Sequence, residues 1–367
     1  MKRLTEFSGL ADPTFSQAVI DWQKIHGRHA LPWQNTTDAY RIWLSEIMLQ
    51  QTQVAAVLGY YARFLERFPN VITLADAPAE DVMAHWAGLG YYTRARNLHA
   101  CAKRVAHEYG GVFPGDPALL ADLPGIGRST AAAIAAFSGG FRAAIMDGNV
   151  KRVFARVFGV DQYPGEKRVE EALWRRADAL LPETGIESYT QGLMDLGATL
   201  CTRSRPACER CPLQQRCIAY ATGRTDELPI RKPKKTVPEK HTQMLVILDQ
   251  GQVLLHQRVA SGIWGGLVSL PEVNGHLPMA DMAPADEAML RAGAAFGTVE
   301  EMQPLLPLVH VFTHYKLHIQ PYRVALGQRR ALPAGYLWFD MDNIEQAALP
   351  SPVKKLLAQM AAPTLFS

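Results

Sequence analysis

The chain has 367 residues, with 38 Lys and Arg against 35 Asp and Glu, so its formal net charge is only +3. Any affinity for nucleic acid must therefore come from local basic patches. Hydrophobic residues make up 48% of the chain, enough for a buried core, but no apolar run reaches the ~18 residues of a membrane span. The first residues lack the apolar segment of a secretory signal, so we expect a cytoplasmic protein that enters no membrane.

The chain changes its periodicity once. From residue 15 to about 222, apolar residues recur every three or four positions, as in VEEALWRRADALL, which predicts helices. Residues 228–240, LPIRKPKKTVPEK, hold three prolines and few apolar residues, as is typical of an extended linker. Beyond it, QMLVILDQGQVLLHQRV and HVFTHYKLHIQPYRVAL alternate with a period of two, which predicts strands. We predict a multidomain protein with an all-α domain (1–227), a linker (228–241) and an α+β domain (242–367).

The first candidate for chemistry is Glu46, in the segment IWLSEIMLQQT. Its helical neighbours are apolar, and burial among them should raise the pKa of the carboxyl group, so that it carries a proton at neutral pH. A buried structural ion pair is the alternative reading.

The second candidate is a glycine turn at residues 123–127, LPGIG, which precedes the good helix former RSTAAAIAAF. Gly125 and Gly127 allow a tight turn at a helix N-terminus, where unpaired N–H groups can bind a phosphate. Two helices joined in this way, at about 116–137, make a helix-hairpin-helix that grips the DNA backbone. An ordinary glycine-rich turn remains possible.

Twenty residues further on, the segment IMDGNVKRV places Asp147 before Gly148 and Asn149. A carboxylate on a glycine turn near a phosphate-binding hairpin could meet a sugar carbon, although Asp147 could also simply cap the next helix. One protonated and one ionised carboxylate, here Glu46 and Asp147, are the groups needed to cleave a glycosidic bond through an oxocarbenium-like transition state.

Four cysteines, Cys201, Cys208, Cys211 and Cys217, follow with the spacing C-x6-C-x2-C-x5-C. Four thiolates can enclose a tetrahedral zinc or an iron–sulfur cluster, and the unequal gaps favour one compact loop around the larger object. The loop also carries four arginines, which indicates a surface that faces phosphates.

The cysteine spacing, LPGIG, DGNVKRV, LSEIMLQQTQV and GLGYYTRARNL together resemble the endonuclease III superfamily of base-excision DNA glycosylases, and within it the MutY-type adenine glycosylases. The resemblance implies hydrolysis of the N-glycosidic bond of adenine mispaired with 8-oxoguanine or guanine. It implies one 4Fe–4S cluster on the four cysteines and no nucleotide cofactor. Glu46 would protonate adenine N7, Asp147 would stabilise the sugar cation, and Asn149 would lie beside it.

The same resemblance implies the contacts with double-stranded DNA. Gln51 and Tyr91 would wedge into the duplex where the adenine is flipped out. The adenine pocket would include Leu31, Trp33 and Gln191, of which the first two also read as plain core. The expected DNA-binding residues are Gln50, Gln51, Tyr91, Gly125, Gly127, Ser129, Lys151, Arg203 and Arg205.

One position indicates the type of reaction. Ser129 stands where the lyase-type relatives carry a lysine nucleophile, and serine cannot form a Schiff base with the abasic sugar. We therefore expect a monofunctional glycosylase that leaves the DNA backbone uncut and works as a monomer. Lys151, close in sequence to Asp147, leaves room for a weak lyase side activity.

The second domain resembles a Nudix fold. Residues 261–272, SGIWGGLVSLPE, match the start of a Nudix box, but the following VNGHLPMADMAP lacks the acidic helix that binds magnesium. We therefore expect no catalytic magnesium. Phe312, Thr313 and His314 fall on the loop that reads 8-oxoguanine in the family, with threonine in place of the usual serine.

Three other functions remain open at this stage. A pyrimidine glycosylase with lyase activity is disfavoured by Ser129 and by the second domain. A catalytically silent DNA-damage-binding module is disfavoured by the presence of both Glu46 and Asp147. A Nudix nucleotide hydrolase is disfavoured by the missing magnesium-binding carboxylates.

Overall fold

The computed structural model describes residues 11–232, 237–259, 261–273, 276, 279, 282, 284–312 and 314–361. The chain packs into two compact units, of which the first is Met1–Asp76 with Asn97–Lys234 and the second is Ala77–Arg96 with Lys235–Ser367. The boundaries predicted at 227 and 242 stay a prediction. The packing adds that Ala77–Arg96 groups with the C-terminal unit, where Arg96 Nη1 donates to the carbonyl of Gly265 at 2.7 Å.

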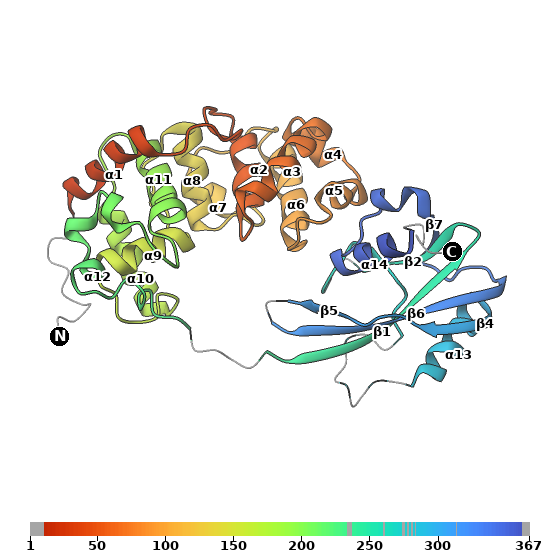
Figure 1. Ribbon diagram of the computed structural model, residues 1–367. Helices are drawn as coiled ribbons and strands as arrows, with labels where there is room; N and C mark the ends of the chain where they lie inside the picture. The colour runs from red at the N-terminus through yellow and green to blue at the C-terminus, as the bar shows by residue number, and fades with distance from the viewer. Residues whose placement is uncertain are drawn as a thin grey trace. The chain divides into compact units, whose positions relative to one another are not determined.

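The first unit is helical (Figure 1). Its α-helices are α1 (Pro13–His26), α2 (Ala39–Leu49), α3 (Val54–Arg67), α4 (Val71–Asp76), α6 (Thr93–Glu108, whose first residues belong to the second unit), α7 (Pro117–Ala121), α8 (Arg128–Gly139), α9 (Gly148–Val157), α10 (Lys167–Ala179), α11 (Ile186–Asp195) and α12 (Ile218–Ala221). A π-helical turn, η1 (Leu196–Leu200), extends α11, and two 3₁₀ turns, η2 (Cys208–Arg210) and η3 (Gln214–Arg216), lie in the cysteine loop.

Helix α8 lies at the centre of this unit, between α11 and α2 in Figure 1. Its residues 131–136 are all buried, and five of the six are alanine, so neighbouring helices can approach closely. Phe15 and Val19 of α1 and Phe154 of α9 belong to the hydrophobic core on one side of it. The core therefore fixes the starts of α8 and α9, where the predicted phosphate-binding turn and Asp147 lie.

The predicted helix-hairpin-helix consists of α7 and α8. Asp116 caps α7 by accepting from the backbone N–H of Ala118 at 2.6 Å, and Pro117 occupies the first turn. In the connecting turn, Gly125 has φ +78°, and a Cβ there would lie 2.8 Å from the Cβ of Asn97. Glycine is thus required at position 125 both by the backbone conformation and by the space available.

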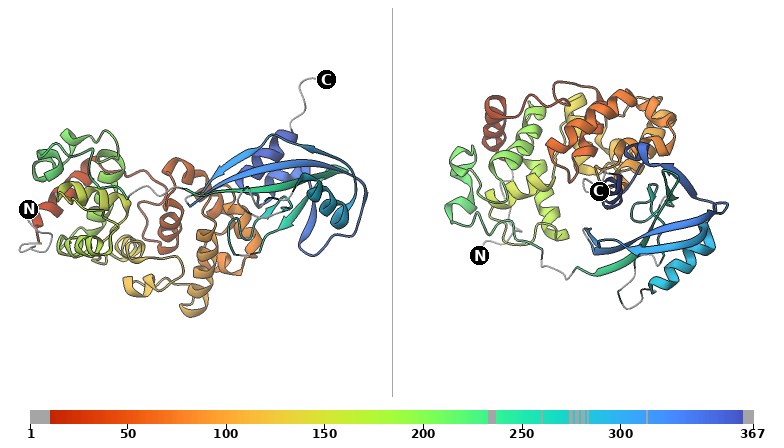
Figure 2. Two further views of the ribbon diagram at one scale, coloured as in Figure 1. Left: turned by 90° about the horizontal axis from the view of Figure 1, so that it is seen from below. Right: turned by 45° about the vertical axis from the view of Figure 1, so that its right-hand side comes forward.

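Among the described residues, the second unit is built on a seven-stranded mixed sheet with the strand order β3-β2-β1-β6-β4, in which β5 also pairs with β6 and β7 with β2. Strands β1 and β6 run parallel side by side (Figure 2), and the remaining pairs are antiparallel. The strands are β1 (Glu239–Asp249), β2 (Gln252–Gln257), β3 (Val268–Ser269), β4 (Gly297–Pro304), β5 (Leu308–Val311), β6 (Lys316–Arg329) and β7 (Tyr336–Asp340). The helices of this unit are α5 (Ala79–Trp86), α13 (Ala285–Phe296), α14 (Ser351–Ala361) and the 3₁₀ turn η5 (Met341–Gln346).

The hairpin predicted around Gln250 and Gly251 is confirmed. The two residues have φ +48° and +75°, the backbone twist that two-residue β-hairpins favour. Helix α13 packs on the sheet through Ala288, Ala292 and Phe296. The predicted combination of an all-α part and an α+β part is therefore confirmed. Within the described ranges, none of the helices is sufficiently long and apolar to cross a bilayer.

Candidate active site

A cavity of about 1860 Å³ opens in the first unit and is called the main cavity below. Its walls come from the loop after α1, the C-terminal end of α2, the start of α8, the start of α9, and α11 with η1. Residues from widely separated parts of the sequence thus meet around one space. The site residues proposed from the sequence that line it are Leu31, Trp33, Glu46, Gln50, Gln51, Ser129, Asp147, Asn149, Gln191 and Arg203.

Asp147 is the N-cap residue of α9, and its two carboxylate oxygens have different partners. Oδ1 accepts from the backbone N–H of Val150 at 2.8 Å, whereas Oδ2 accepts from Asn149 Nδ2 at 3.3 Å. Burial raises the pKa of Asp147, while the hydrogen bonds from Val150 and Asn149 and the charge of Arg152 act to lower it. Asp147 therefore both caps α9 and lines the main cavity.

Glu46 enters the main cavity from α2. Burial raises the pKa of its carboxyl group to about 8, and the negative charge of Asp147 contributes in the same direction. The charge that acts on Glu46 is thus another carboxylate and not a cation, which argues against a structural ion pair. At neutral pH Glu46 is mostly protonated, as the sequence predicted.

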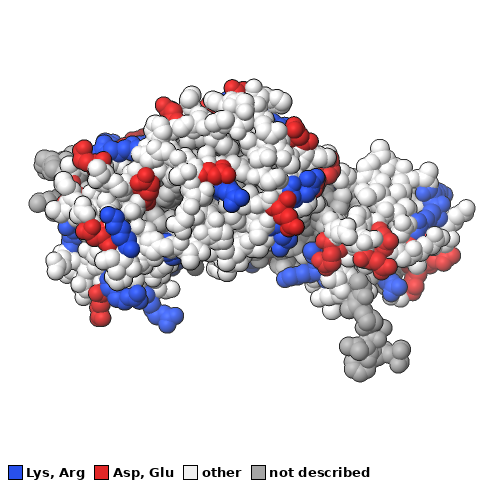
Figure 3. Space-filling model, turned by 90° about the horizontal axis from the view of Figure 1, so that it is seen from above, with Lys and Arg blue, Asp and Glu red and all other residues white. Residues whose placement is uncertain are grey.

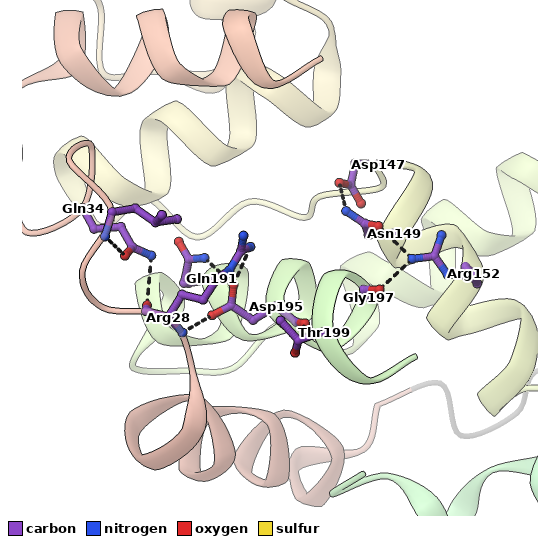
Figure 4. A network of polar contacts seen from close by, with 10 residues as sticks. Arg28, Gln34, Asp147, Asn149, Arg152, Gln191, Asp195, Gly197 and Thr199 are labelled. Atoms are coloured by element: carbon purple, nitrogen blue, oxygen red, sulfur yellow. Dashed lines mark hydrogen bonds and ion pairs between the residues drawn. The ribbon is translucent and has the colours of Figure 1, made fainter. Parts of the chain in front are cut away.

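Arg152 of α9 connects Asn149 to the segment before the cysteine loop (Figure 4). Its Nη2 donates to Asn149 Oδ1 at 2.8 Å and to the carbonyl of Gly197 at 2.7 Å, and its Nε donates to the carbonyl of Cys201 at 2.7 Å. Because Arg152 can only donate, the oxygen of the Asn149 amide must face it. The amide nitrogen of Asn149 is therefore left to hold Asp147.

A second polar network, centred on the buried Asp195, supports other residues that line the main cavity (Figure 4). Asp195 at the end of α11 accepts from Arg28 Nε at 2.7 Å and from Gln191 Nε2 at 2.8 Å. Gln34 Nε2 donates to the carbonyl of Arg28 at 3.0 Å, and Gln34 Oε1 accepts from Leu31 N at 3.1 Å. Arg28 and Asp195 were not predicted, because no local pattern relates residues that lie 167 positions apart.

Two further residues of the cavity wall are held by neighbours. Trp33 is only 8% exposed and contacts Tyr61 edge to face, with 5.2 Å between the ring centroids. The hydroxyl of Ser129 accepts from the backbone N–H of Met146 at 2.9 Å, so the start of α8 supports the segment before Asp147.

Two residues of the predicted DNA surface have distinctive surroundings. Gln51, at the end of α2, has φ +56°, a left-handed conformation that is uncommon for a residue with a side chain. Lys151 does not line the main cavity, and its Nζ lies 2.5 Å from Glu170 Oε1 of α10. Tyr91 is 46% exposed and belongs to the second unit, so its predicted role at the DNA stays a prediction.

The four cysteines line one small cavity beside α9. The guanidinium of Arg156, which is 2% exposed, donates to Cys201 Sγ at 3.3 Å and to the carbonyls of Thr202 at 2.7 Å and Leu228 at 2.8 Å. Throughout the described ranges, no three His, Cys, Asp or Glu side chains are arranged to hold a metal ion. Four thiols around one space, next to a buried cation, fit a thiolate-bound anionic group.

The arginines of the cysteine loop are not equivalent. Arg203 is exposed and lines the main cavity, and Arg205 is exposed with φ +52°. Arg216 instead lies 2.6 Å from Asp12, the cap of α1, so it anchors the loop to the core of the unit. Basic and acidic side chains are interspersed on the face drawn in Figure 3, in keeping with the small net charge.

In the second unit, Phe312 and His314 lie in the turn between β5 and β6, and Thr313 lies outside the described residues. The ring of Phe312 contacts Trp264 and Tyr315, with centroid distances of 5.5 and 4.9 Å. Glu272, at the end of the Nudix-like motif, pairs with Arg258 at 2.7 Å. Much of the segment that follows also lies outside the described residues.

Comparisons with known proteins cover both units. Residues 44–178 match the HhH-GPD superfamily of base excision DNA repair proteins, and residues 243–359 match a NUDIX domain. The adenine DNA glycosylase of Buchnera aphidicola subsp. Schizaphis graminum is 35% identical over 347 residues, which cover 94% of this chain and 97% of that protein. The mouse adenine DNA glycosylase is 33% identical over 405 residues, which cover 95% of this chain and 78% of that protein. Among solved structures, a thermostable thymine-DNA glycosylase is 30% identical with a TM-score of 0.52, over 57% of this chain and 95% of that one.

Proposed function

Because the chain belongs to the adenine DNA glycosylase family, we propose that it removes adenine mispaired with 8-oxoguanine or guanine from double-stranded DNA. The enzyme is a DNA N-glycosylase of base excision repair. The observation that carries the finer proposal is the meeting of Glu46 and Asp147 in one cavity, with the pKa of Glu46 raised to about 8. We further expect a monomer that acts on DNA in the cytoplasm.

Glu46 acts as the general acid in this account. Adenine is a poor leaving group as an anion, and protonation at N7 lets it depart as a neutral base. Since the pKa of Glu46 lies near 8, the carboxyl group holds its proton at neutral pH and yet can transfer it. Burial is the largest cause of the raised pKa, so the apolar neighbours of Glu46 in α2 help to keep it protonated.

Asp147 stabilises the positive charge that develops on the deoxyribose as the bond breaks. An ionised carboxylate close to an oxocarbenium-like centre is among the largest electrostatic contributions available to a glycosylase. Asn149 and the cap of α9 hold Asp147 in place and favour its charged form. Arg152 fixes the amide of Asn149 in turn.

The adenine must leave the duplex to reach these groups. Gln50 and Gln51 line the main cavity, and with Tyr91 they are proposed to fill the space that the base vacates. The pocket for the flipped base is proposed to consist of Leu31, Trp33 and Gln191. The DNA backbone is proposed to bind at the N–H groups of the hairpin around Gly125 and Gly127, at Ser129, and at Lys151, Arg203 and Arg205.

The enzyme is proposed to leave the DNA strand uncut. Ser129 has no amine for a Schiff base, and its hydroxyl accepts a hydrogen bond from Met146. Lys151 is held by Glu170 and does not line the main cavity. Both observations support a monofunctional reaction.

The proposed cofactor is one 4Fe–4S cluster held by Cys201, Cys208, Cys211 and Cys217. The shared cavity and the buried charge of Arg156 support a thiolate-bound anionic group there, and the resemblance in cysteine spacing favours the cluster. When bound, the cluster would join the four thiolates and thereby fix the loop that carries Arg203 and Arg205. We propose no chemical step through it, and no catalytic magnesium.

The second unit is proposed to recognise the base opposite the adenine. Phe312 and His314 lie in the turn between β5 and β6, where Phe312 contacts Trp264 and Tyr315, and Thr313 is proposed to act with them. Such a turn can stack on a base and hydrogen-bond to its edge, which suits a reader of 8-oxoguanine.

A single-turnover assay tests the whole proposal. Duplexes would carry adenine opposite 8-oxoguanine, guanine or cytosine, and products would be resolved with and without alkali. We expect rapid base loss opposite 8-oxoguanine, slower loss opposite guanine, little opposite cytosine, and strand breaks only after alkali. Strand breaks without alkali would refute the monofunctional reaction, and release of an oxidised pyrimidine in place of adenine would refute the substrate.

A further inference from the structure

A fully buried carboxylate, that of Asp195, lies behind the wall of the main cavity. Its side chain has no exposed surface, and it does not line the cavity itself. Oδ2 accepts from the backbone N–H of Arg28 at 2.8 Å, and Oδ1 accepts from Arg28 Nε at 2.7 Å and from Gln191 Nε2 at 2.8 Å. This buried carboxylate therefore holds both Arg28 and Gln191, two residues that line the cavity, through hydrogen bonds.

The carboxylate determines how the amide of Gln191 is oriented. An ionised carboxylate can only accept hydrogen bonds, so the NH₂ group of Gln191 must face Asp195 (Figure 4). The amide oxygen, on the other branch of the same planar group, is then directed away from Asp195. Because Gln191 lines the main cavity, its oxygen serves as an acceptor on the cavity side.

The same carboxylate holds the guanidinium of Arg28. Both Nε and Nη2 of Arg28 lie 2.7 Å from Asp195 Oδ1. Arg28 is 30% exposed and lines the main cavity, so the rest of its planar donor group is presented there. The Gln34 amide, which donates to the Arg28 carbonyl at 3.0 Å, fixes the backbone of this residue as well.

The cavity wall therefore presents an acceptor, from Gln191, beside a donor, from Arg28. The Watson–Crick edge of adenine has the matching pattern, since its 6-amino group donates and its N1 accepts. Hypoxanthine has the reverse pattern, because its 6-oxo group accepts and its N1–H donates. The two bases share N7 and the glycosidic bond, so Glu46 and Asp147 would treat them alike.

We infer that Asp195 is a positioning residue that selects adenine over a 6-oxopurine by fixing the hydrogen-bonding directions of Gln191 and Arg28. The inference rests on the proposed function, since it assumes that the excised base enters the main cavity. Selectivity for the base then depends on a residue that never touches it.

The test is the ratio of single-turnover rates for adenine and hypoxanthine, each placed opposite 8-oxoguanine, at saturating enzyme. The wild-type chain should favour adenine. Asp195→Asn leaves one acceptor oxygen in place of two, so its NH₂ group must face either the backbone N–H of Arg28 or the side-chain donors of Arg28 and Gln191. The hydrogen-bonding directions of Arg28 and Gln191 are then no longer fixed. The ratio should fall by about tenfold or more, the size of one good bidentate base contact. Equal losses for both bases would reduce Asp195 to a structural role and overturn the inference.

Two further variants keep the test decisive if Asp195→Asn folds poorly. Gln191→Leu removes the acceptor without touching the carboxylate, and it should lower the same ratio, whereas an unchanged ratio would overturn the inference. In the double variant the loss should be smaller than the product of the two single losses, because the part of the Asp195 effect that acts through Gln191 is already gone, while independent losses would contradict action through Gln191. Glu108→Gln on α6 makes the same chemical change in an exposed ion pair with Arg104, and it should leave the ratio unchanged.

The wild-type result separates this inference from the proposed function. If the wild-type chain removes no adenine opposite 8-oxoguanine, the proposed function fails, and the inference fails with it. If adenine is removed but the variants keep the wild-type ratio, only the role of Asp195 is refuted. Circular dichroism of each variant would establish that the helical fold is intact.

Discussion

The negative charge of Asp147 helps to keep a proton on Glu46. The two carboxyl groups come from the start of α9 and from α2, and they line the same cavity. Burial raises the pKa of Glu46 to about 8 with the help of this charge. Burial also raises the pKa of Asp147, but hydrogen bonds from Val150 and Asn149 and the charge of Arg152 oppose that shift. The cation and hydrogen-bond donors around Asp147 thus distinguish its surroundings from those of Glu46.

Asp147→Asn should abolish base removal while leaving duplex binding largely intact. An asparagine can still cap α9 through its side-chain oxygen, so the fold should survive, but an amide cannot offset the charge of a sugar cation. We expect a loss of at least about 10²–10³-fold in the single-turnover rate, by analogy with the removal of other transition-state electrostatic contacts. Gel-shift titration provides the control for binding. Near-normal turnover would exclude Asp147 from the chemistry.

Glu46→Gln should change stability in a pH-dependent way. The pKa of Glu46 is about 8 in the folded chain, against the ordinary 4.5 expected in the unfolded chain, so between these pH values the folded state holds a proton that the unfolded state has lost. The wild-type free energy of unfolding therefore loses this contribution as the pH rises from about 4.5 to 8, at about 1.4 kcal/mol per pH unit. Glutamine does not titrate. The free energy of unfolding of the variant, relative to that of the wild type, should therefore rise between about pH 4.5 and 8 and stay constant above pH 8.

Urea unfolding of both proteins between pH 5 and 9 measures this difference. A gap that stays constant with pH would show that Glu46 has an ordinary pKa in the folded chain. Glu108→Gln, which changes an exposed carboxylate on α6, should show no comparable trend.

The purified protein should be yellow-brown and contain about four irons per chain, as a 4Fe–4S cluster requires. Elemental analysis after anaerobic preparation measures iron, and acid-labile sulfide provides an independent count. Stoichiometric zinc with no iron would contradict the cluster and favour the four-thiolate zinc site that the sequence left open.

Thr313→Ala should weaken the preference for 8-oxoguanine over guanine opposite the adenine. A lost hydrogen bond to a base edge changes such a preference by roughly tenfold, since a good contact pair discriminates by about 1–3 kcal/mol. The ratio of single-turnover rates opposite the two bases provides the measurement. Thr298→Ala, an exposed change on β4 of the same unit, is the matched control. If Thr313→Ala and the control behave alike, Thr313 does not read the opposite base.

The features predicted well from the sequence are local ones. The Gln250-Gly251 hairpin follows from two residues that tolerate positive φ, and Gly125 marks its turn for the same reason. The raised pKa of Glu46 follows from apolar neighbours within one helix. Such features depend on a few consecutive residues, so a pattern can reveal them.

The features that were missed depend on tertiary packing. Arg28 and Asp195 meet across 167 residues, and Arg152 reaches Gly197 and Cys201 across more than 40. The grouping of Ala77–Arg96 with the C-terminal unit is of the same kind. In the sequence, Arg28, Arg152 and Asp195 look like ordinary exposed charged residues. Their partners follow only from the packing of the helices.

The central claim is that a protonated Glu46 drives the release of adenine. The most direct test is the single-turnover rate of adenine release opposite 8-oxoguanine, measured from pH 5 to 10 on the wild-type chain and on Glu46→Gln. We expect the wild-type rate to fall as the pH rises through about 8, where Glu46 loses its proton, and the variant to be nearly inactive throughout. A wild-type rate that stays constant to pH 10, or a variant as active as the wild type, would contradict it.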